Sequence, residues 1–284
     1  MNWLDALILG IVQGLTEYLP VSSSGHIEIF KDILGVDLPA DENLTFSVLV
    51  HAATVLSTIV VLWPMFARLC KSFFTFKRGY DFDYVCKILL SCIPVGIVGV
   101  FFKHQVEAIF GEGLTVVGIC LIVTALLLTF AWLSDLRAAR CVQLKDGSKA
   151  VMVQREGRNI SWRDAIIIGC AQAVAVLPGL SRSGTTIATG IMLGDKRDEV
   201  AKFSFLMVIL PIIGESLLDV KDMVAGAGAG TSEIGAIPML VGFVAAFVVG
   251  CGACKWMIDL VKKGKLVWFA VYCVIMGVIC LLWQ

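Results

Sequence analysis

Two short polar stretches in otherwise apolar sequence hold the residues whose types and spacing could do chemistry. The first reads PVSSSGH over residues 20–26, and the second reads PGLSRSG over residues 178–184. At membrane depth, an irregular polar backbone is tolerated only where protein or a wet cavity surrounds it, and an ionisable group there suggests function. Reactive groups are therefore expected in and beside these two stretches.

The first stretch brings together a carboxylate, hydroxyls and a histidine. Gln13 and Glu17 are four residues apart, so they share one face of a short predicted helix. The next helix can be capped by Ser22 or Ser23. If it begins there, Ser23 and His26 also share a face, and with Glu17 they could form a nucleophile, its base and a carboxylate. A purely structural serine-rich turn is the alternative, but burying Glu17 and His26 in a membrane without a task is costly.

The second stretch predicts an anion site. Arg182 lies at its tip and is the only basic residue outside the predicted loops and span ends. A guanidinium, hydroxyls and helix-end amides commonly bind oxyanions, and the neighbouring hydroxyls are those of Ser181, Ser183, Thr185 and Thr186. The alternative is a structural arginine bound to backbone carbonyls. With Glu17 holding a hard cation and Arg182 neutralising phosphoryl oxygens, the pair would suit a metal-bound phosphate substrate.

The elements that must position these residues are predicted to be membrane helices. The chain is 58% hydrophobic, against roughly 45–50% for a soluble domain, which predicts an all-α polytopic membrane protein. A net charge of +0 gives no sign of a nucleic-acid partner. Six apolar stretches are long enough, or nearly so, to cross a bilayer: 44–63, 85–102, 114–133, 203–219, 235–254 and 266–283. His51, a lone histidine in the first of these, is expected to be a packing residue.

Four shorter apolar stretches flank the polar ones in pairs: 3–19 with 26–35, and 164–177 with 185–194. Short helix, polar tip and short helix form the pattern of a re-entrant hairpin. A shift of 159 residues aligns the two regions, pairing Trp3 with Trp162, Asp5 with Asp164, Gln13 with Gln172 and Gly25 with Gly184. We therefore predict a duplication within a single membrane domain, 1–284: repeat one 1–133, a cytoplasmic connector 134–161 and repeat two 162–284.

Counting crossings predicts that the repeats are inverted. Each half has one hairpin and three full spans, an odd number of crossings, so the hairpins enter from opposite faces and their tips can meet near the midplane. Lys and Arg are concentrated in loops 64–84, 134–163, 195–202 and 255–265, whereas the other side has only Lys31, Lys103 and Lys221. The crowded side is therefore predicted to be cytoplasmic, with both termini outside. Ten full spans would distribute the charge similarly, so the prediction of re-entrance depends on segment length.

Small residues at Gly242, Ala245, Ala246 and Gly250 allow close helix packing. They could serve packing within the chain or a homodimer.

The motifs QGLTEYLPVSSSGH and PGLSRSGTT resemble the two signatures of the undecaprenyl-diphosphate phosphatase family, also known as bacitracin-resistance proteins. The resemblance covers essentially the whole chain. It implies hydrolysis of the terminal phosphate of a C55 polyprenyl diphosphate in the bacterial plasma (inner) membrane. This reaction regenerates the lipid carrier for peptidoglycan synthesis and confers bacitracin resistance.

The resemblance also implies roles for individual residues. Gln13 and Glu17 would bind a divalent cation, Mg²⁺ or Ca²⁺, although Gln13 leaves one charge fewer than the glutamate of some members. Ser23 or His26 would be the nucleophile or its partner. The diphosphate would be held by Ser22, Ser24, Ser181, Arg182, Ser183 and Thr186.

Features of the sequence also match two other functions. Inverted repeats with polar motifs at the midplane are also typical of transporters, so a polyprenyl-phosphate flippase or an anion transporter is the alternative. Ser24-Gly25-His26 resembles part of the phosphatidic-acid phosphatase signature. That class requires a second histidine after its Ser-Arg pair, and no histidine follows His104.

Overall fold

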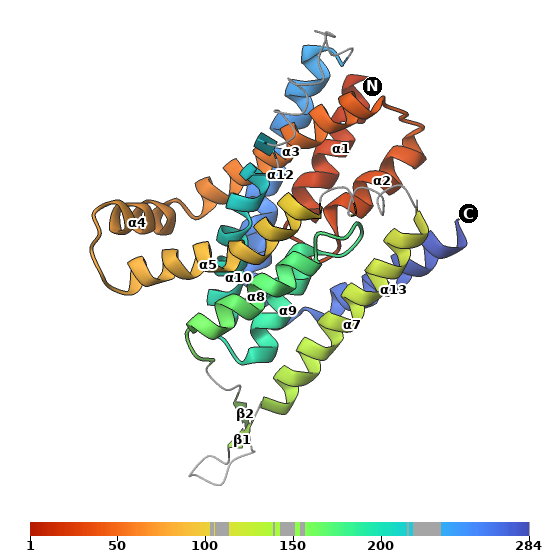
Figure 1. Cartoon of the computed structure of the whole chain (residues 1–284). Coiled ribbons are helices and arrows are strands. Elements are labelled where there is room, and N and C mark those ends of the chain that lie inside the picture. Colours follow the sequence, from red (N-terminus) through yellow and green to blue (C-terminus); the bar gives the residue numbers. More distant parts are fainter. Residues whose placement is uncertain are drawn as a thin grey trace.

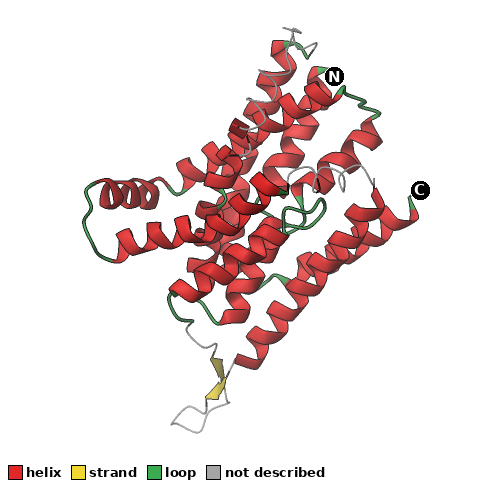
Figure 2. Ribbon diagram, viewed as in Figure 1, coloured by secondary structure: helices red, strands yellow, loops and turns green. Residues whose placement is uncertain are grey.

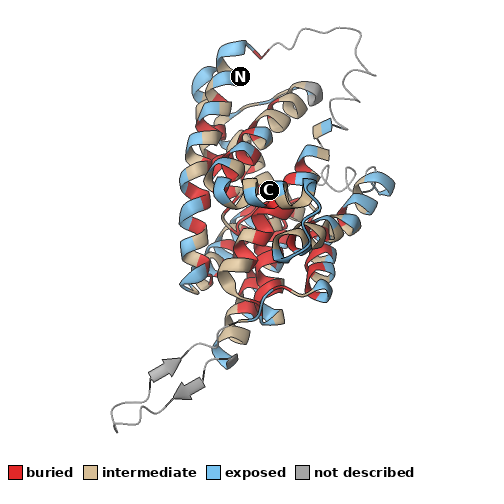
Figure 3. Ribbon diagram, turned by 90° about the vertical axis from the view of Figure 1, so that its left-hand side faces the viewer, coloured by how far each residue is buried: buried red, intermediate tan, exposed pale blue. Residues whose placement is uncertain are grey.

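The computed structural model describes residues 1–102, 105, 114–138, 140–142, 151–153, 157–214, 216, 217 and 234–283. The described part is a bundle of long helices around two short helical hairpins (Figures 1 and 2). Buried residues gather at the centre of the bundle, while the outer faces of the helices are exposed (Figure 3). Many of the exposed residues are large and apolar, among them Ile97, Leu126, Val248 and Val271. A surface of this kind is suited to lipid rather than to water.

Among the described residues, four helices are long and apolar enough to cross a membrane: α3 (Ala40–Val61), α5 (Tyr80–Phe101), α7 (Leu114–Ala138) and α12 (Ala236–Lys262). They match four of the six predicted spans. The last predicted span is α13 (Val267–Leu282), an apolar helix of 16 residues. The chain is therefore a polytopic, essentially all-α membrane protein, as its composition predicted.

The remaining predicted span, 203–219, is not one continuous helix. Helix α10 (Arg197–Met207) ends at a turn at Val208, and residues 209–214 are helical again. Pro211 has no N–H with which to reach the Met207 carbonyl one turn earlier. That carbonyl instead accepts a hydrogen bond from the Cys92 thiol, 3.3 Å away. Residues 218 and 219 lie outside the described residues.

Three elements were not predicted from the sequence. Helix α4 (Trp63–Phe74) occupies the first half of the predicted loop 64–84, with Pro64 in its first turn. Strands β1 (Arg140–Val142) and β2 (Val151–Val153) form a small antiparallel ribbon in the predicted connector. An apolar stretch long enough to span a membrane is a much longer signal than a strand of three residues, so apolar length does not reveal these strands.

The two hairpins have matching local structure. The first consists of α1 (Trp3–Thr16) and α2 (Ser23–Leu34), and the second of α8 (Trp162–Val174) and α9 (Arg182–Leu193). Both α1 and α8 begin with a capping box, formed by Asn2 with Asp5 and by Ser161 with Asp164. Both α2 and α9 begin at a serine cap and end at a left-handed glycine: Ser22 and Gly35, and Ser181 and Gly194. Every pair is related by the shift of 159, as expected for a duplication.

Each hairpin packs against the opposite half of the chain. Helix α1 lies along α12, where Gly10 faces the Gly242 carbonyl, and α8 lies along α5, where Gly169 faces the Ser91 carbonyl. A side chain at either glycine would collide with that backbone. The small residues of α12 are buried, and Gly242 and Gly250 also contact Phe46 and Ser57 of α3. Packing within the chain therefore accounts for this stripe.

The tips of the two hairpins meet inside the bundle. The Ser183 hydroxyl donates to the Leu19 carbonyl, 3.2 Å away. Both chain termini lie at the end of the molecule opposite the β1–β2 ribbon (Figure 1). Residues far apart in the sequence thus meet at one point, between the two ends of the bundle.

Candidate active site

Glu17 is the centre of a hydrogen-bonded cluster at the end of α1. Its side chain is 6% exposed. Oε2 accepts hydrogen bonds from Gln13 Nε2 at 3.0 Å and from the Ser23 hydroxyl at 2.7 Å. Gln13 reaches Glu17 because the two lie one helical turn apart, and Ser23 reaches it because the chain reverses between α1 and α2. A hydroxyl and a carboxylate so placed can exchange a proton.

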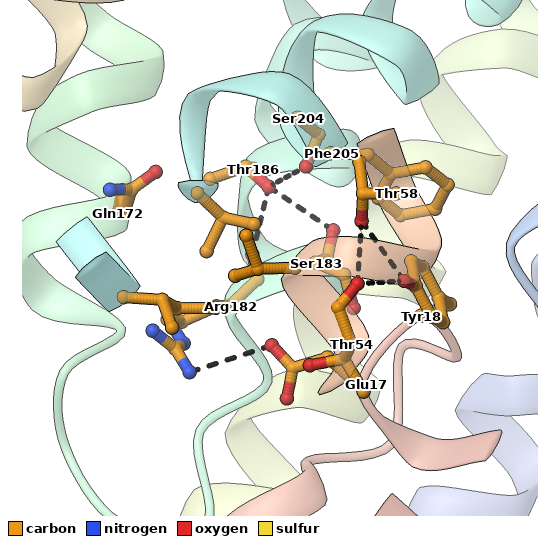
Figure 4. Close-up of a pocket in the computed structure, with 13 residues that line it drawn as sticks. Glu17, Tyr18, Thr54, Thr58, Gln172, Arg182, Ser183, Thr186, Ser204 and Phe205 are labelled. Atoms are coloured by element: carbon orange, nitrogen blue, oxygen red, sulfur yellow. Dashed lines mark hydrogen bonds and ion pairs between the residues drawn. The ribbon is translucent and has the colours of Figure 1, made fainter. Parts of the chain in front are cut away.

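Arg182 joins the second hairpin to this cluster. It is the first residue of α9, and its Nη2 lies 3.5 Å from Glu17 Oε1 (Figure 4). The Arg182 side chain is 21% exposed. The amides of the first turn of α9 add positive partial charge beside the guanidinium. The site thus combines one carboxylate from the first hairpin with a fixed cation from the second.

His51 belongs to the cluster, and its assignment as a packing residue was wrong. Its Nε2 lies 3.7 Å from Glu17 Oε2. Its Nδ1 lies 2.8 Å from the Ser47 carbonyl, which can only accept a hydrogen bond, so Nδ1 carries a proton. The contact joins α1 to α3, so the spacing of residues along the chain does not reveal it. The one signal in the sequence was a histidine within an apolar span, the criterion that singled out His26.

His26 is directed away from the cluster. It is buried, with Nδ1 2.8 Å from the Ser22 carbonyl and Nε2 2.7 Å from the Tyr272 hydroxyl of α13. The two rings are stacked, with centroids 5.6 Å apart. Because the partners of both ring nitrogens are Ser22 and Tyr272, the predicted convergence of His26 with Ser23 and Glu17 is not formed. Three residues along a helix are about 60° apart around its axis, enough to turn His26 toward α13.

The predicted phosphate-binding hydroxyls are mostly engaged in local structure. Ser22 and Ser181 accept from the amides of Gly25 and Gly184 as helix caps. Ser24 lies 3.4 Å from the Ser22 hydroxyl. Two hydroxyls of α9 nevertheless line the same cavity as Glu17 and Arg182, those of Ser183 and Thr186. Thr186 also hydrogen bonds to the Ser204 hydroxyl.

The cavity beside Glu17 and Arg182 is small and adjoins an apolar one. Its volume is about 20 Å³, room for about one water molecule. The second cavity, of about 210 Å³, shares Val55 and Ile212 with the first. Its other lining residues are Ala52, Ile213, Ser216 and Leu217. A polar site with an apolar extension is suited to an amphiphile with an anionic head.

Comparison with known families places the whole cluster inside one family match. A family model described as bacitracin resistance protein BacA matches residues 6–279. The chain belongs to this family. The match includes the tips of both hairpins and every residue of the cluster.

Curated relatives of this BacA-family chain are similar over its full length. A protein of Bacteroides fragilis named undecaprenyl-diphosphatase is 52% identical over 279 residues, which is 98% of this chain and 97% of the relative. A protein of the same name from Parabacteroides distasonis is 53% identical over the same shares of the two chains. One from Methanobrevibacter smithii is 38% identical, covering 98% of this chain and 96% of the relative.

The BacA-family site has donors that fit a divalent cation. The Gln13 amide nitrogen is committed to Glu17, and its oxygen is buried with no hydrogen-bond partner. A buried acceptor without a donor, beside a carboxylate, is suited to a hard cation. Within the described residues, no group of three or more His, Cys, Asp and Glu side chains could hold a metal ion. A cation here would therefore take its other ligands from phosphate and water, as Mg²⁺ commonly does.

Proposed function

We propose that this chain is an integral membrane phosphatase that hydrolyses undecaprenyl diphosphate to undecaprenyl phosphate and inorganic phosphate. The observation that carries the proposal is the meeting of Glu17 with Arg182 beside an apolar cavity. One hairpin offers a carboxylate and a hydroxyl, and the other a guanidinium. Together they complement a cation-bound diphosphate on a lipid. The full-length relatives named undecaprenyl-diphosphatase support the choice of substrate.

In this structure the Glu17–Arg182 ion pair occupies the position that the substrate head would take. The polar cavity has room for about one water molecule, so a diphosphate can enter only if the two side chains separate. Phosphoryl oxygens then replace Glu17 on Arg182, whose planar fork suits them. The polyprenyl chain extends through the apolar cavity between α3 and the side chains of Ile212, Ile213 and Leu217. This arrangement keeps the lipid in the membrane while its head is inside the protein.

A divalent cation, Mg²⁺ or Ca²⁺, would be held by Gln13 Oε1 and the Glu17 carboxylate. When bound, it would neutralise negative charge on the diphosphate. Because Gln13 is uncharged, the protein contributes one negative charge to the cation.

Ser23 is the proposed nucleophile. Its Oγ bonds to the terminal phosphorus while the bond from that phosphorus to the bridging oxygen breaks, releasing undecaprenyl phosphate. Glu17 accepts the Ser23 proton along their 2.7 Å hydrogen bond. Water then attacks the phosphoserine, inorganic phosphate leaves, and Glu17 returns the proton to Ser23. Arg182 stabilises the charge on the phosphoryl oxygens throughout.

The reaction would return the lipid carrier to peptidoglycan synthesis, and removal of the diphosphate form would confer bacitracin resistance. We place the protein in the bacterial plasma membrane, with repeats 1–133 and 162–284 inverted, the connector 134–161 in the cytoplasm and both termini outside. The distribution of Lys and Arg and the position of the termini opposite the β1–β2 ribbon support this orientation. Protease accessibility of tags at the two termini in sealed cells tests it.

The function is tested with the purified full-length protein and a long-chain polyprenyl diphosphate. Phosphate release is expected with a divalent cation and not after chelation. The double variant Glu17→Ala, Arg182→Ala should lose more than about 10³-fold in kcat/KM, because it removes both charges of the site. The matched control is the double variant Glu28→Ala, Lys31→Ala, which removes a 2.8 Å ion pair whose Glu28 side chain is 46% exposed. This variant should retain activity.

Two outcomes would overturn the proposal. Normal turnover by the Glu17, Arg182 double variant would show that the site is elsewhere. Lipid or anion translocation without hydrolysis would favour the flippase or transporter.

A further inference from the structure

Two glutamines occupy equivalent positions in the two hairpins. Gln13 of α1 and Gln172 of α8 are related by the shift of 159, and both are fully or almost fully buried. Gln172 lines the cavity that contains Glu17 and Arg182 (Figure 4). Gln172 therefore contributes to this cavity from the second hairpin, as Arg182 does.

The two amides leave opposite groups without a partner. In Gln13 the nitrogen donates to Glu17, and the buried oxygen has no donor. In Gln172 the buried nitrogen has no acceptor. A buried polar atom without a hydrogen bond is unfavourable unless a ligand or water completes it. Gln13 therefore lacks a cation or donor, and Gln172 lacks an acceptor.

The surroundings of Gln172 favour an anionic acceptor. The groups that line the cavity with it include the Arg182 guanidinium and the hydroxyls of Ser183 and Thr186, as well as the Glu17 carboxylate. A half-turn about the last side-chain bond exchanges the amide oxygen and nitrogen, so the NH₂ group can be presented to the cavity. An amide donor beside a guanidinium is a common arrangement for binding phosphate.

We propose that Gln172 binds a phosphoryl oxygen of the substrate, and that the two glutamines divide the work of recognition between the repeats. Gln13 presents its oxygen to the cation, and Gln172 presents its NH₂ group to the phosphate. This inference rests on the proposed phosphatase function. It adds a substrate-binding residue outside both polar motifs, because Gln172 precedes PGLSRSG by six positions.

Crossed substitutions at the two glutamines test the division. Gln172→Leu removes the donor at similar size and should raise both the KM for polyprenyl diphosphate and the Ki for inorganic phosphate by about tenfold. The cation concentration for half-maximal activity should not change. Gln172→Glu places a negative charge beside the phosphate and should have a larger effect on the same two constants. Gln13→Leu should raise the cation requirement and leave the Ki for phosphate unchanged.

A second measurement separates recognition from folding and from catalysis. Inorganic pyrophosphate should raise the melting temperature of the detergent-solubilised wild type and of Gln13→Leu, but not that of Gln172→Leu. If the wild type binds pyrophosphate and hydrolyses no lipid, the proposed function fails while Gln172 is still tested. Unchanged phosphate and pyrophosphate affinity in Gln172→Leu, or a changed cation requirement instead, would overturn the inference.

Discussion

The two hairpins have one backbone plan and opposite chemistry. Both begin with a capping box and end their second helix at a left-handed glycine. In the sequence alignment with a shift of 159, however, Glu17 corresponds to Val176, Ser23 to Arg182 and His26 to Thr185. The first hairpin supplies the Glu17 carboxylate and the proposed nucleophile Ser23, and the second supplies the Arg182 guanidinium. The tips diverged at these three positions, while the serine caps beside them, Ser22 and Ser181, are the same in both hairpins.

The turns of the two hairpins also differ in backbone conformation. Ser22 has φ 70°, one of two non-glycine residues with positive φ among the described residues, whereas Ser181 has φ −68°. Such a conformation costs on the order of 1–3 kcal/mol and is found most often at functional sites. In this chain it immediately precedes Ser23, the proposed nucleophile. The strained turn therefore belongs to the hairpin with the proposed nucleophile, and the relaxed turn to the hairpin with Arg182.

The largest expected effect is that of Ser23→Ala, and its comparison with Arg182→Lys separates loss of the nucleophile from loss of substrate binding. Ser23→Ala should lower kcat by about 10³-fold or more with little change in KM, because it removes the nucleophile. Arg182→Lys keeps the charge, loses the planar fork and should mainly raise KM, by about tenfold. Steady-state kinetics with polyprenyl diphosphate measures both. Trapping of the phosphoenzyme should label Ser23 in the wild type.

The matched control is Thr129→Ala, which removes a helix hydroxyl that bonds only to the Ala125 carbonyl. It should behave as wild type. Equal effects of the Ser23 and Arg182 substitutions on the same constant would contradict the division between the hairpins.

An intermediate effect is expected from the two histidines of repeat one. His51→Ala should lower kcat about tenfold, because Glu17 loses a polar neighbour at 3.7 Å, and His51→Gln should recover part of the loss by restoring a polar side chain there. His26→Ala should instead lower the melting temperature, since it removes the bond to Tyr272 that ties α2 to α13. Kinetics and thermal unfolding of the same preparations measure the two outcomes.

Tyr272→Phe is the control for His26, because it removes the same hydrogen bond at the other end. It should reproduce the loss of stability. An inactive His26→Ala protein beside a fully active Tyr272→Phe protein would return His26 to the catalytic group.

The smallest effect concerns the base of the second hairpin. Asp195 follows α9 and is 4% exposed. The position equivalent to it in the first hairpin, at the shift of 159, is the uncharged Val36. Burial, together with the nearby Asp164, raises its pKa to about 7, although Arg158 Nε lies 3.5 Å away. Because the folded pKa exceeds the unfolded one, stability should fall as pH rises from about 4 to about 7 and stay low above that.

Asp195→Asn should remove this slope. At pH 8 the variant should be more stable than the wild type by ~1 kcal/mol, which is about 2–4 °C in melting temperature. Thermal unfolding in detergent between pH 5 and pH 8 measures it. A wild-type melting temperature that rises over this range would show that Asp195 is ionised and well paired in the folded protein.

Much of the molecule follows from sequence because its signals are local. Apolar length locates α3, α5, α7 and α12, since a helix in a membrane must satisfy its own backbone and present a lipid-compatible surface. The caps at Ser22 and Ser181, and the one-turn spacing of Gln13 and Glu17, are likewise properties of neighbouring residues. The break in the predicted span 203–219 also had a local signal. Pro211 cannot donate a helix hydrogen bond, and the apolar length of the segment does not reflect this.

The sequence by itself determined an all-helical membrane protein with two related polar hairpins, a carboxylate in one and an arginine in the other. Only the tertiary structure decided which side chains meet: His51 joins Glu17, His26 pairs with Tyr272, and Gln172 lines the cavity beside Arg182. These contacts connect helices far apart in the chain, and they depend on the rotation of each helix about its axis. That rotation is set by packing, such as Gly10 against Gly242, which no single segment encodes.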